Sequence, residues 1–317
     1  MARCQADPRC QRDAQRSAVI DLSIVIVSHN TAAFLEACLD SIERTKPEGL
    51  TLEVIVVDNA SSDETADVVR SKHPGVTLIA IAENTGFSRA NNRGVAAASG
   101  RYFLFLNPDT EMRDGTLARM LAFMEETPQA GAATCFVALP SGALDDAAHR
   151  GFPTPWNSLC HFSGLARLFP HSRHFSGYSL GWMDLHTTHE IEALAGAFML
   201  VRREAGQQVG WWDEEYFFYG EDLDFCYRLR LGDWLVYYVP EVSILHYKGM
   251  ASGIRRESRS RTTASTETRV AATRYRFEAM RIFYRKHLLG RYPRPLTWLV
   301  MRAVDLKERQ ALRSARR

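Results

Sequence analysis

Short apolar runs alternate with amphipathic stretches through the first third of the chain, and this alternation constrains the fold more than any other feature. The stretches between the runs have the periodicity of helices that cover a sheet. Strands separated by such helices pair in parallel, because each crossover returns the chain to the same end of the sheet. The sequence therefore predicts an α/β fold with a mostly parallel sheet flanked by helices. The strands are expected at residues 22–28, 53–58, 76–82 and 102–107, and the helices at 32–44, 62–71 and 88–98.

Polar side chains follow each expected strand. Ser28, His29 and Asn30 follow the first, and a run from Asp58 to Asp63 follows the second. The third is followed by Glu83-Asn84-Thr85-Gly86 and the fourth by Asn107-Pro108-Asp109. These residue types also form ordinary turns, so each segment alone has a structural explanation. Because the carboxyl ends of parallel strands share one edge of a sheet, the four segments together predict a polar pocket suited to a nucleotide.

A second cluster combines acids with aromatic residues, in the run Tyr219-Gly-Glu-Asp-Leu-Asp-Phe-Cys-Tyr-Arg228. Burying an unpaired carboxylate is costly, so such a cluster has either a structural partner or a chemical task. Asp224 and Arg228 are four residues apart and can pair on a helix, and Glu221 and Asp222 suit a helix N-terminus. From these residues alone, structure and catalysis remain equally open.

Composition limits the class of protein. The chain has 317 residues, 46% hydrophobic and 24% charged, which is typical of a globular protein. It has no apolar run long enough to span a membrane, and residues 1–17 are too polar for a signal peptide, so we expect a cytoplasmic protein. Six cysteines without a C-x-x-C pair argue against a zinc site or a disulfide framework. Residues 251–317 carry a net charge of +13, which leaves −11 for residues 1–250.

The pattern divides the chain into three parts. Residues 1–18 are expected to form a disordered lead, residues 19–250 the main domain, and residues 251–317 a flexible loop and a basic helical tail. Within the main domain, residues 19–127 would hold the nucleotide and residues 128–250 the second substrate. Residues 140–190 contain many aromatic, proline and glycine residues, and we expect an irregular insertion with its own small core. Its His186 and His189 have no neighbours in sequence that complete a metal site.

Four ordered blocks carry a resemblance to a known family. They are Ser23 to Asn30; Val56 to Asp63; Asn84 to Gly94, leading to Leu106-Asn-Pro-Asp109; and Gly210 to Glu214, leading to Glu221-Asp222. Together they resemble the inverting family 2 glycosyltransferases with the GT-A (Rossmann-like) fold. The rhamnosyltransferase-like branch, which builds bacterial surface polysaccharides, is the most similar. The resemblance covers roughly residues 21–250.

The resemblance implies a donor site for a nucleotide-sugar. Asp58 would accept a hydrogen bond from a pyrimidine ring N–H, which fits a UDP- or dTDP-sugar. The other residues implied to contact the donor are Ser28, Asn30, Asn84, Arg89, Asn92 and Asn107. Asn107-Pro108-Asp109 stands where the family places an Asp-x-Asp metal motif, so the first acid is an amide here. Asp109 and His246 would be ligands of Mn²⁺ or Mg²⁺, and the imidazole favours Mn²⁺.

The resemblance also assigns the acid cluster. Asp222 aligns with the family's general base, and a helix N-terminus would keep its carboxylate charged. Glu221 would bind an acceptor hydroxyl together with Trp211, Trp212 and Asp213, although either tryptophan could equally belong to the core. Arg255 and Arg256 lie in a segment that could close over the diphosphate. The acceptor would be a glycan or a lipid-linked glycan.

Other classes of protein remain as alternatives. A non-catalytic nucleotide-sugar binder with the same fold would explain the amide at Asn107. A sugar nucleotidyltransferase would need a Gly-rich basic loop after the first strand, and Ser28-His-Asn-Thr31 is unlike that loop. A nucleic-acid binder would need aromatic residues suited to base stacking in the basic tail. Peripheral contact with an anionic membrane is expected instead, through Trp298-Leu-Val-Met301 within the basic residues 291–317.

Overall fold

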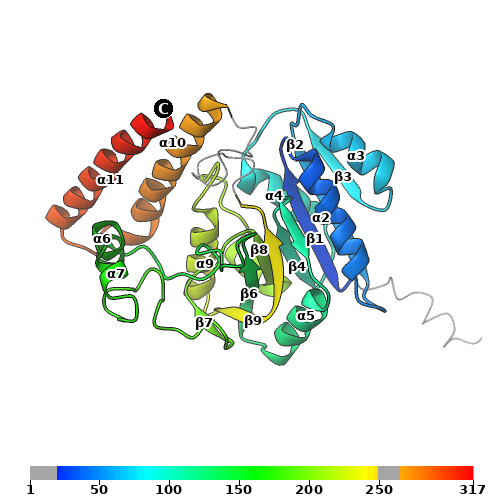
Figure 1. The fold of residues 1–317 in the computed structure, drawn as a ribbon, viewed down its shortest axis with the longest axis horizontal. Helices are drawn as coiled ribbons and strands as arrows, with labels where there is room; N and C mark the ends of the chain where they lie inside the picture. Colours follow the sequence, from blue (N-terminus) through cyan, green and yellow to red (C-terminus); the bar gives the residue numbers. More distant parts are fainter. Residues whose placement is uncertain (1–19, 249–264, 317) are drawn as a thin grey trace, which may run out of the picture.

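The computed structural model describes residues 20–248 and 265–316 of the chain (Figure 1). Its centre is a nine-stranded mixed sheet in which eight strands follow the order β3-β2-β1-β4-β8-β6-β9-β5, while β7 pairs with β9 at the side. The expected lead at residues 1–18 and the loop residues Arg255 and Arg256 lie outside the described residues.

The first half of the sheet is parallel, as the alternation predicts. Its strands are β1 (Leu22–Ser28), β2 (Leu52–Asn59), β3 (Thr77–Ile81) and β4 (Tyr102–Leu106). They alternate with the helices α2 (Ala32–Thr45), α3 (Thr65–Lys72) and α4 (Phe87–Ala97), each within three residues of its expected bounds. Ser28 pairs with Asp58 in the register of β1 and β2, so their polar ends lie side by side at one rim.

The second half of the sheet is mixed, which the expectation of a mostly parallel sheet did not include. β8 (Phe198–Arg202) runs antiparallel to both β4 and β6 (Ala130–Ala138), and β9 (Leu235–His246) runs parallel to β6. Two short strands, β5 (Thr110–Met112) and β7 (His189–Ile191), pair antiparallel with β9. The helices of this half are α5 (Thr116–Glu126), α8 (Arg203–Val209) and α9 (Glu221–Leu231).

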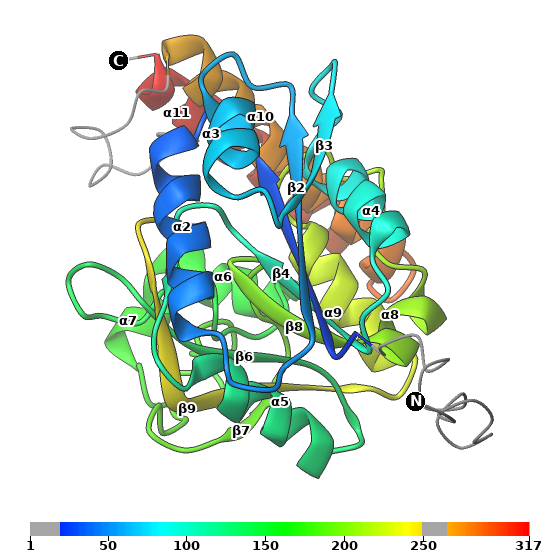
Figure 2. The ribbon, with the colours of Figure 1, turned by 90° about the vertical axis from the view of Figure 1, so that its right-hand side faces the viewer.

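Alternating side chains of the strands divide the core into two layers. Ile24 and Ile26 of β1 point toward α2, whose buried Leu35, Cys38 and Ile42 recur at helical spacing. Val25 points to the other face, where Val25 Cγ1 would lie 2.4 Å from a Cβ added at Gly94 of α4. The glycine therefore lets α4 pack closely on the sheet, and α2 and α4 cover opposite faces (Figure 2).

Residues 139–188 form an irregular segment with two short helices, α6 (Pro155–Ser163) and α7 (Leu165–Leu168). A small aromatic cluster exists there, because the ring of Trp156 lies 4.8 Å from His174 and 6.3 Å from Phe175. Phe152 instead joins the main core, with its ring 4.9 Å from that of Tyr227. The segment is thus anchored to the sheet domain at its start and has its own packing further on.

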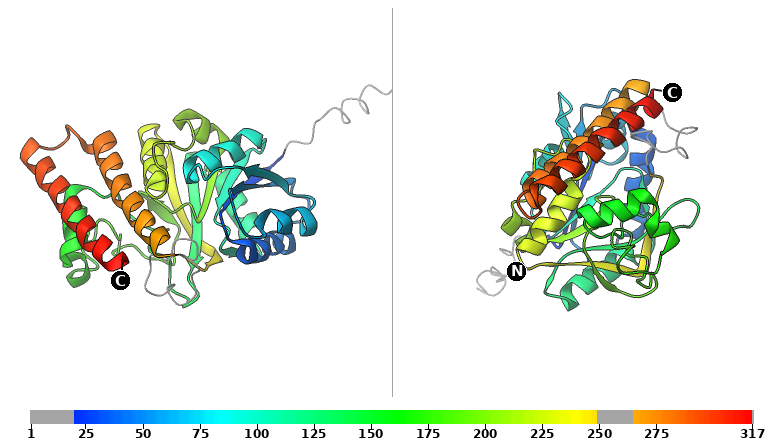
Figure 3. Two further views of the ribbon diagram at one scale, coloured as in Figure 1. Left: turned by 90° about the horizontal axis from the view of Figure 1, so that it is seen from above. Right: turned by 90° about the vertical axis from the view of Figure 1, so that its left-hand side faces the viewer.

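The basic tail folds back as a helical hairpin. α10 (Thr266–Phe283) continues into a π-helical turn, η1 (Tyr284–Leu288), and α11 (Arg294–Ala315) returns alongside α10 (Figure 3, left). Tyr275 of α10 stacks on Phe217 with ring centres 4.5 Å apart, and Ile282 packs with the buried Tyr216. The hairpin is therefore attached to the segment that leads into α9. Among the described helices, none is long and apolar enough to cross a membrane.

Candidate active site

The loops after β1 and β2 are joined by short hydrogen bonds. Asn30 adopts a left-handed conformation, with φ of 55°, and its Oδ1 accepts from the backbone N–H of Ser62 at 2.7 Å. The hydroxyls of Ser28 and Thr31 lie 2.7 Å apart. Asp58 is almost fully buried, and its Oδ1 accepts from the N–H of Ser61 at 3.1 Å. The structure thus places Ser28, Asn30 and Asp58 together, as expected.

The loop after β3 joins this rim through an asparagine that the sequence analysis missed. Asn59 donates to Asn84 Oδ1 at 3.0 Å and accepts from the N–H of Thr85 at 2.9 Å. Asn84 also accepts from the N–H of Gly86, so its side chain holds the turn before α4. Gly86 has a φ of 83°, and an added Cβ would lie 2.6 Å from the carbonyl oxygen of Phe217. Only glycine fits here, and it brings the Phe217 loop to the rim.

Two residues of α4 turn toward the loop at 210–214. The Asn92 amide donates to the carbonyl of Trp212 at 2.9 Å and accepts from its N–H at 3.1 Å. This reciprocal pair uses both ends of the amide, so Asn92 joins two segments of the protein, and its contact with a nucleotide stays a prediction. Arg89 is exposed, with its Nε 3.3 Å from Glu214.

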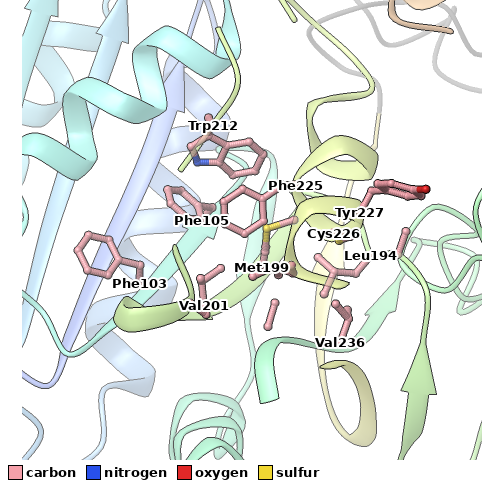
Figure 4. Close-up of a cluster of buried hydrophobic side chains, with 14 of the residues drawn as sticks. Phe103, Phe105, Leu194, Met199, Val201, Trp212, Phe225, Cys226, Tyr227 and Val236 are labelled. Atoms are coloured by element: carbon pink, nitrogen blue, oxygen red, sulfur yellow. The ribbon is translucent and has the colours of Figure 1, made fainter. Parts of the chain in front are cut away.

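The two tryptophans expected at the acceptor wall pack in the core. Trp212 is 2% exposed, and its ring lies 4.8 Å from Phe105 and 5.1 Å from Phe225 (Figure 4). Trp211 packs 4.6 Å from Phe103, near the start of β4 and therefore opposite the polar rim. The position of Trp212 corrects the expectation of an acceptor contact, because its buried indole has no face left for a sugar, and the alternative that it is a core residue applies. Trp211 is half-buried and packs against the same core at the end of the sheet away from the polar rim.

The two expected metal ligands are adjacent. His246, at the end of β9, has its Nε2 3.3 Å from Asp109 Oδ1, and its Nδ1 lies 2.9 Å from Asp145 Oδ2. Burial alone would lower the pKa of His246, but the carboxylates Asp109 and Asp145 raise it to about 9. Asp145 also pairs with Lys248, and the sequence analysis identified neither of these two residues. Without a metal, a protonated His246 is held between two carboxylates.

The spacing of Asp109 and His246 fits a divalent ion. Two ligands about 2.1 Å from one ion and at right angles to each other are about 3 Å apart, close to the observed distance. Among the described residues there is no group of three or more His, Cys, Asp or Glu side chains arranged for a metal. The remaining ligands of such an ion would come from outside the described residues, such as water or a bound ligand.

The acid cluster lies at the N-terminus of α9, after a left-handed Gly220. Asp222 Oδ2 accepts from Arg150 Nη2 at 2.5 Å, while its Oδ1 accepts from the N–H of Leu223 at 2.7 Å. Both side chains of the Arg150–Asp222 pair are largely buried. Burial, together with the Asp222 carboxylate, raises the pKa of Glu221 to about 8. Asp222 thus lies beside a cation, whereas the buried Oε2 of Glu221 has no hydrogen-bond partner within the described part of the chain.

Asp224 has the structural role that the sequence offered as one alternative. Arg228 Nε donates to Asp224 Oδ2 at 2.6 Å, one helical turn away. The ring of His287, from η1, lies 2.7 Å from the other carboxylate oxygen. Asp213 is paired with Lys286 of the same turn, so its carboxylate contacts the C-terminal hairpin.

A connecting segment joins the acid cluster to the rim. Arg150 donates to the carbonyl of Leu194 at 3.3 Å, and the N–H of Asn107 donates to the carbonyl of Ala197 at 3.1 Å. On the other side, the N–H of Phe87 donates to the carbonyl of Phe217 at 2.7 Å, just before α9. These contacts therefore connect the segments of the chain that carry Asp58, Asp109 and Asp222.

The chain matches known proteins over most of its length. The sequence profile described as Glycosyl transferase family 2 matches residues 23–186, just over half of the chain, and the protein belongs to this family. N-acetylglucosaminyl-diphospho-decaprenol L-rhamnosyltransferase of Mycobacterium tuberculosis is 27% identical over 93% of this chain and 94% of its own. Rhamnosyltransferase WbbL of Escherichia coli K12 is 28% identical over 71% of this chain and 82% of its own.

The fold has relatives among solved structures. The crystal structure of GalNAc-T7 with UDP, GalNAc and Mn²⁺ superposes on this structure with a TM-score of 0.56 and 16% sequence identity. The superposition covers 84% of this chain and 50% of the GalNAc-T7 chain. At this identity the likeness shows the fold alone, and that fold is GT-A. The protein is thus a family 2 glycosyltransferase of the rhamnosyltransferase-like type.

Proposed function

We propose that this glycosyltransferase inverts the configuration of the transferred sugar, with Asp222 as its general base. The observation that carries the proposal is the ion pair between Asp222 and the buried Arg150 at the N-terminus of α9. A base must be held within hydrogen-bond reach of the proton that it takes, and the ion pair holds the Asp222 carboxylate in place at the helix N-terminus. Lone pairs on the Asp222 oxygens remain to accept a proton from an acceptor hydroxyl.

The proposed step forms one bond and breaks one. The acceptor oxygen bonds to the anomeric carbon on the face opposite the diphosphate, and the bond from that carbon to the diphosphate oxygen breaks. The hydroxyl proton passes to Asp222, and the diphosphate leaves with the bonding electron pair. Because a carboxylate is a modest base, departure of the diphosphate would run ahead of proton transfer, through an oxocarbenium-like transition state.

The donor in this proposal is a UDP- or dTDP-sugar bound at the rim. Asp58 would accept from the pyrimidine ring, and Ser28, Asn30 and the Asn84 loop would contact the nucleotide. Asp109 and His246 would hold Mn²⁺ or Mg²⁺, with Asn107 near the ion or the sugar. A divalent ion supplies neutralisation of the charge that develops on the diphosphate. Lys248 lies beside this pair and adds a fixed positive charge.

The protonation state of Glu221 bears on its role at the acceptor. Because its pKa is raised to about 8, it is protonated near neutral pH and can donate a hydrogen bond. We therefore propose that Glu221 donates to an acceptor oxygen, next to the charged Asp222. Asp213 and the exposed Arg89 stay candidates for the edge of the acceptor and donor sites.

The acceptor in this proposal is a lipid-linked glycan, and the sugar is rhamnose. The Mycobacterium tuberculosis relative is named for a decaprenol-linked acceptor and a transferred L-rhamnosyl group. The protein would act in cell-surface polysaccharide synthesis at the cytoplasmic face of the membrane. The match covers 93% of this chain, and this coverage supports assigning the same substrates to the protein.

Substitution of Asp222 tests the proposal. Asp222→Asn is expected to lower transfer from dTDP-rhamnose, with Mn²⁺ present, by at least about 100-fold, because one proton acceptor is lost. Nucleotide binding, measured by thermal shift with dTDP, should persist. Asp67→Asn, on the exposed face of α3, is the matched control and should leave transfer unchanged. Unchanged turnover in Asp222→Asn would contradict the assignment of the base. Retention of configuration in the product, read by NMR, would contradict inversion.

A further inference from the structure

The outer face of α11 is apolar and cationic. Trp298, Leu299 and Leu306 are each more than half exposed, and they recur at helical spacing. Val300 and Met301 instead pack against the main core, so the expected patch at 298–301 is split between two faces. The helix therefore presents a stripe of large apolar side chains on a surface that the fold does not cover.

Arginines extend this stripe. Arg302, Arg309 and Arg313 are exposed and lie on the same face by helical spacing, and the Arg302 guanidinium lies 5.5 Å from the centre of the Trp298 ring. Both acids of α11 are paired, because Asp305 and Glu308 accept from Arg281 of α10. Within the described part of α11, positive and apolar groups thus occupy the outer face, and the two carboxylates are paired with Arg281.

The short helices α6 and α7 adjoin this face. Lys307 Nζ of α11 lies 5.5 Å from the centre of the Phe162 ring on α6. Leu159, Leu168 and Phe169 of the same segment are also about half exposed or more. Figures 1 and 3 both show α6 beside α11 at the end of the molecule away from α2 and α3. We call the outer face of α11 together with α6 and α7 the terminal surface.

We propose that the terminal surface docks on the anionic leaflet of a lipid membrane. An interfacial helix buries its apolar side chains among the acyl chains while its Arg and Lys groups contact anionic headgroups. A second copy of the chain would bring the same cations against each other, which disfavours self-association through this face. Nucleic acid would neutralise the arginines but leave the exposed leucines and Trp298 in contact with phosphate and water.

The docking would also place the acceptor. The hairpin contacts the acid cluster directly, because His287 bonds to Asp224 and Lys286 to Asp213. A membrane bound at the terminal surface therefore lies at a fixed orientation to α9. This reading rests on the proposed function only in supposing that the acceptor is embedded in lipid; the membrane contact itself needs no sugar.

Vesicle binding by the full chain tests the inference. The protein should co-sediment with vesicles of equal parts phosphatidylcholine and phosphatidylglycerol, and much less with phosphatidylcholine alone or at high salt. Each cation near an anionic leaflet contributes roughly fivefold in binding, so Arg302→Gln/Arg309→Gln/Arg313→Gln should weaken binding roughly 100-fold. Trp298→Ser/Leu299→Ser should also weaken it. The controls are Arg44→Gln and Leu231→Ser, which are exposed outside the terminal surface.

The outcomes separate this inference from the proposed function. Loss of vesicle binding in the variants, with dTDP binding and donor hydrolysis unchanged, supports docking. Vesicle binding without any sugar transfer keeps the docking and contradicts the function. The inference is overturned if the wild type ignores phosphatidylglycerol or if the variants bind as well as it does. It is also overturned if the same variants instead abolish a dimer, seen by sedimentation, or binding to an oligonucleotide.

Discussion

At the scale of single residues, Arg150 changes how the acid cluster is understood. The guanidinium of Arg150 lies in the interior of the protein, where it pairs with Asp222. Burial would lower the pKa of Arg150, but Asp222 raises it, so the guanidinium stays charged. Arg150 does not need to touch the substrate; it acts as a positioning residue that fixes the Asp222 carboxylate in place.

Substitution of Arg150 should therefore alter catalysis through Asp222. Arg150→Met is expected to lower kcat by about 10- to 100-fold with little change in donor KM, because the base loses its position and its cation. Arg150→Lys should restore part of the activity.

The control for this substitution is Arg230→Met on the same helix, where the arginine is exposed and paired with Glu192. It should leave kcat and KM unchanged. Breaking a buried ion pair costs about 3–5 kcal/mol, so the folded fraction of Arg150→Met must be measured as well. A kcat equal to that of the wild type, in the folded fraction of Arg150→Met, would contradict the positioning role.

The raised pKa of Glu221 predicts a pH dependence of stability. Between about pH 4.5 and 8 the unfolded chain releases the Glu221 proton while the folded chain keeps it. The unfolded state then binds fewer protons, so the free energy of unfolding falls as pH rises through this window. Glu221→Gln cannot ionise and should gain on the order of 2 kcal/mol relative to the wild type at about pH 8, compared with about pH 5.

Urea denaturation at the two pH values measures this difference. Glu43→Gln, on the exposed part of α2, is the matched control and should show no such gain. An equal effect of Glu221→Gln at both pH values would show that Glu221 is ionised in the folded protein throughout.

At the scale of elements, α9 is held from both sides. Its N-terminus follows Gly220, where an added Cβ would lie 2.9 Å from Ala279 of α10. Its buried Asp224 is shared by Arg228 of the same helix and His287 of η1. Burial would raise the pKa of Asp224, but these two partners lower it. The π-helical turn thus places His287 where it joins the C-terminal hairpin to the acid cluster.

His287→Ala should loosen this joint. Loss of one hydrogen bond to a buried carboxylate is expected to cost about 1–3 kcal/mol in the free energy of unfolding. Hydrogen exchange in α10 should rise more than in the β1–β4 half of the sheet. His171→Ala, which removes a surface histidine bonded to the Gly181 carbonyl, is the control and should change stability by less than about 0.5 kcal/mol. Equal exchange rates in α10 of both variants would contradict the coupling.

At the scale of the whole molecule, the sequence predicted the features that depend on residues close together in the chain. The strands β1 to β4, their helices and the Asp224–Arg228 pair all follow from short-range periodicity. The family resemblance then predicted that the acid cluster lies in the same region as the polar rim. The antiparallel insertion of β8 between β4 and β6 was not predictable, because strand order depends on pairings that are distant in sequence.

The partners of the site residues are distant for the same reason. Arg150 lies 72 residues before Asp222, and Asp145 lies 101 residues before His246, so no spacing rule joins them. Burial of Trp212 likewise depends on Phe105 and Phe225 from other elements. The charge asymmetry of the sequence corresponds in part to ion pairs in the structure. Arg285 and Lys286 of the basic tail pair with Glu215 of the acidic body.

The strand order also bears on how the protein is made. β4 is the edge of the parallel half until β8 pairs with it, and β8 leaves the ribosome only after α5, β6, α6 and α7. Until then the wholly buried strand Tyr102–Leu106 has an open row of backbone donors and acceptors. An open apolar edge recruits other strands. Nascent or truncated chains that stop before Phe198 should therefore aggregate.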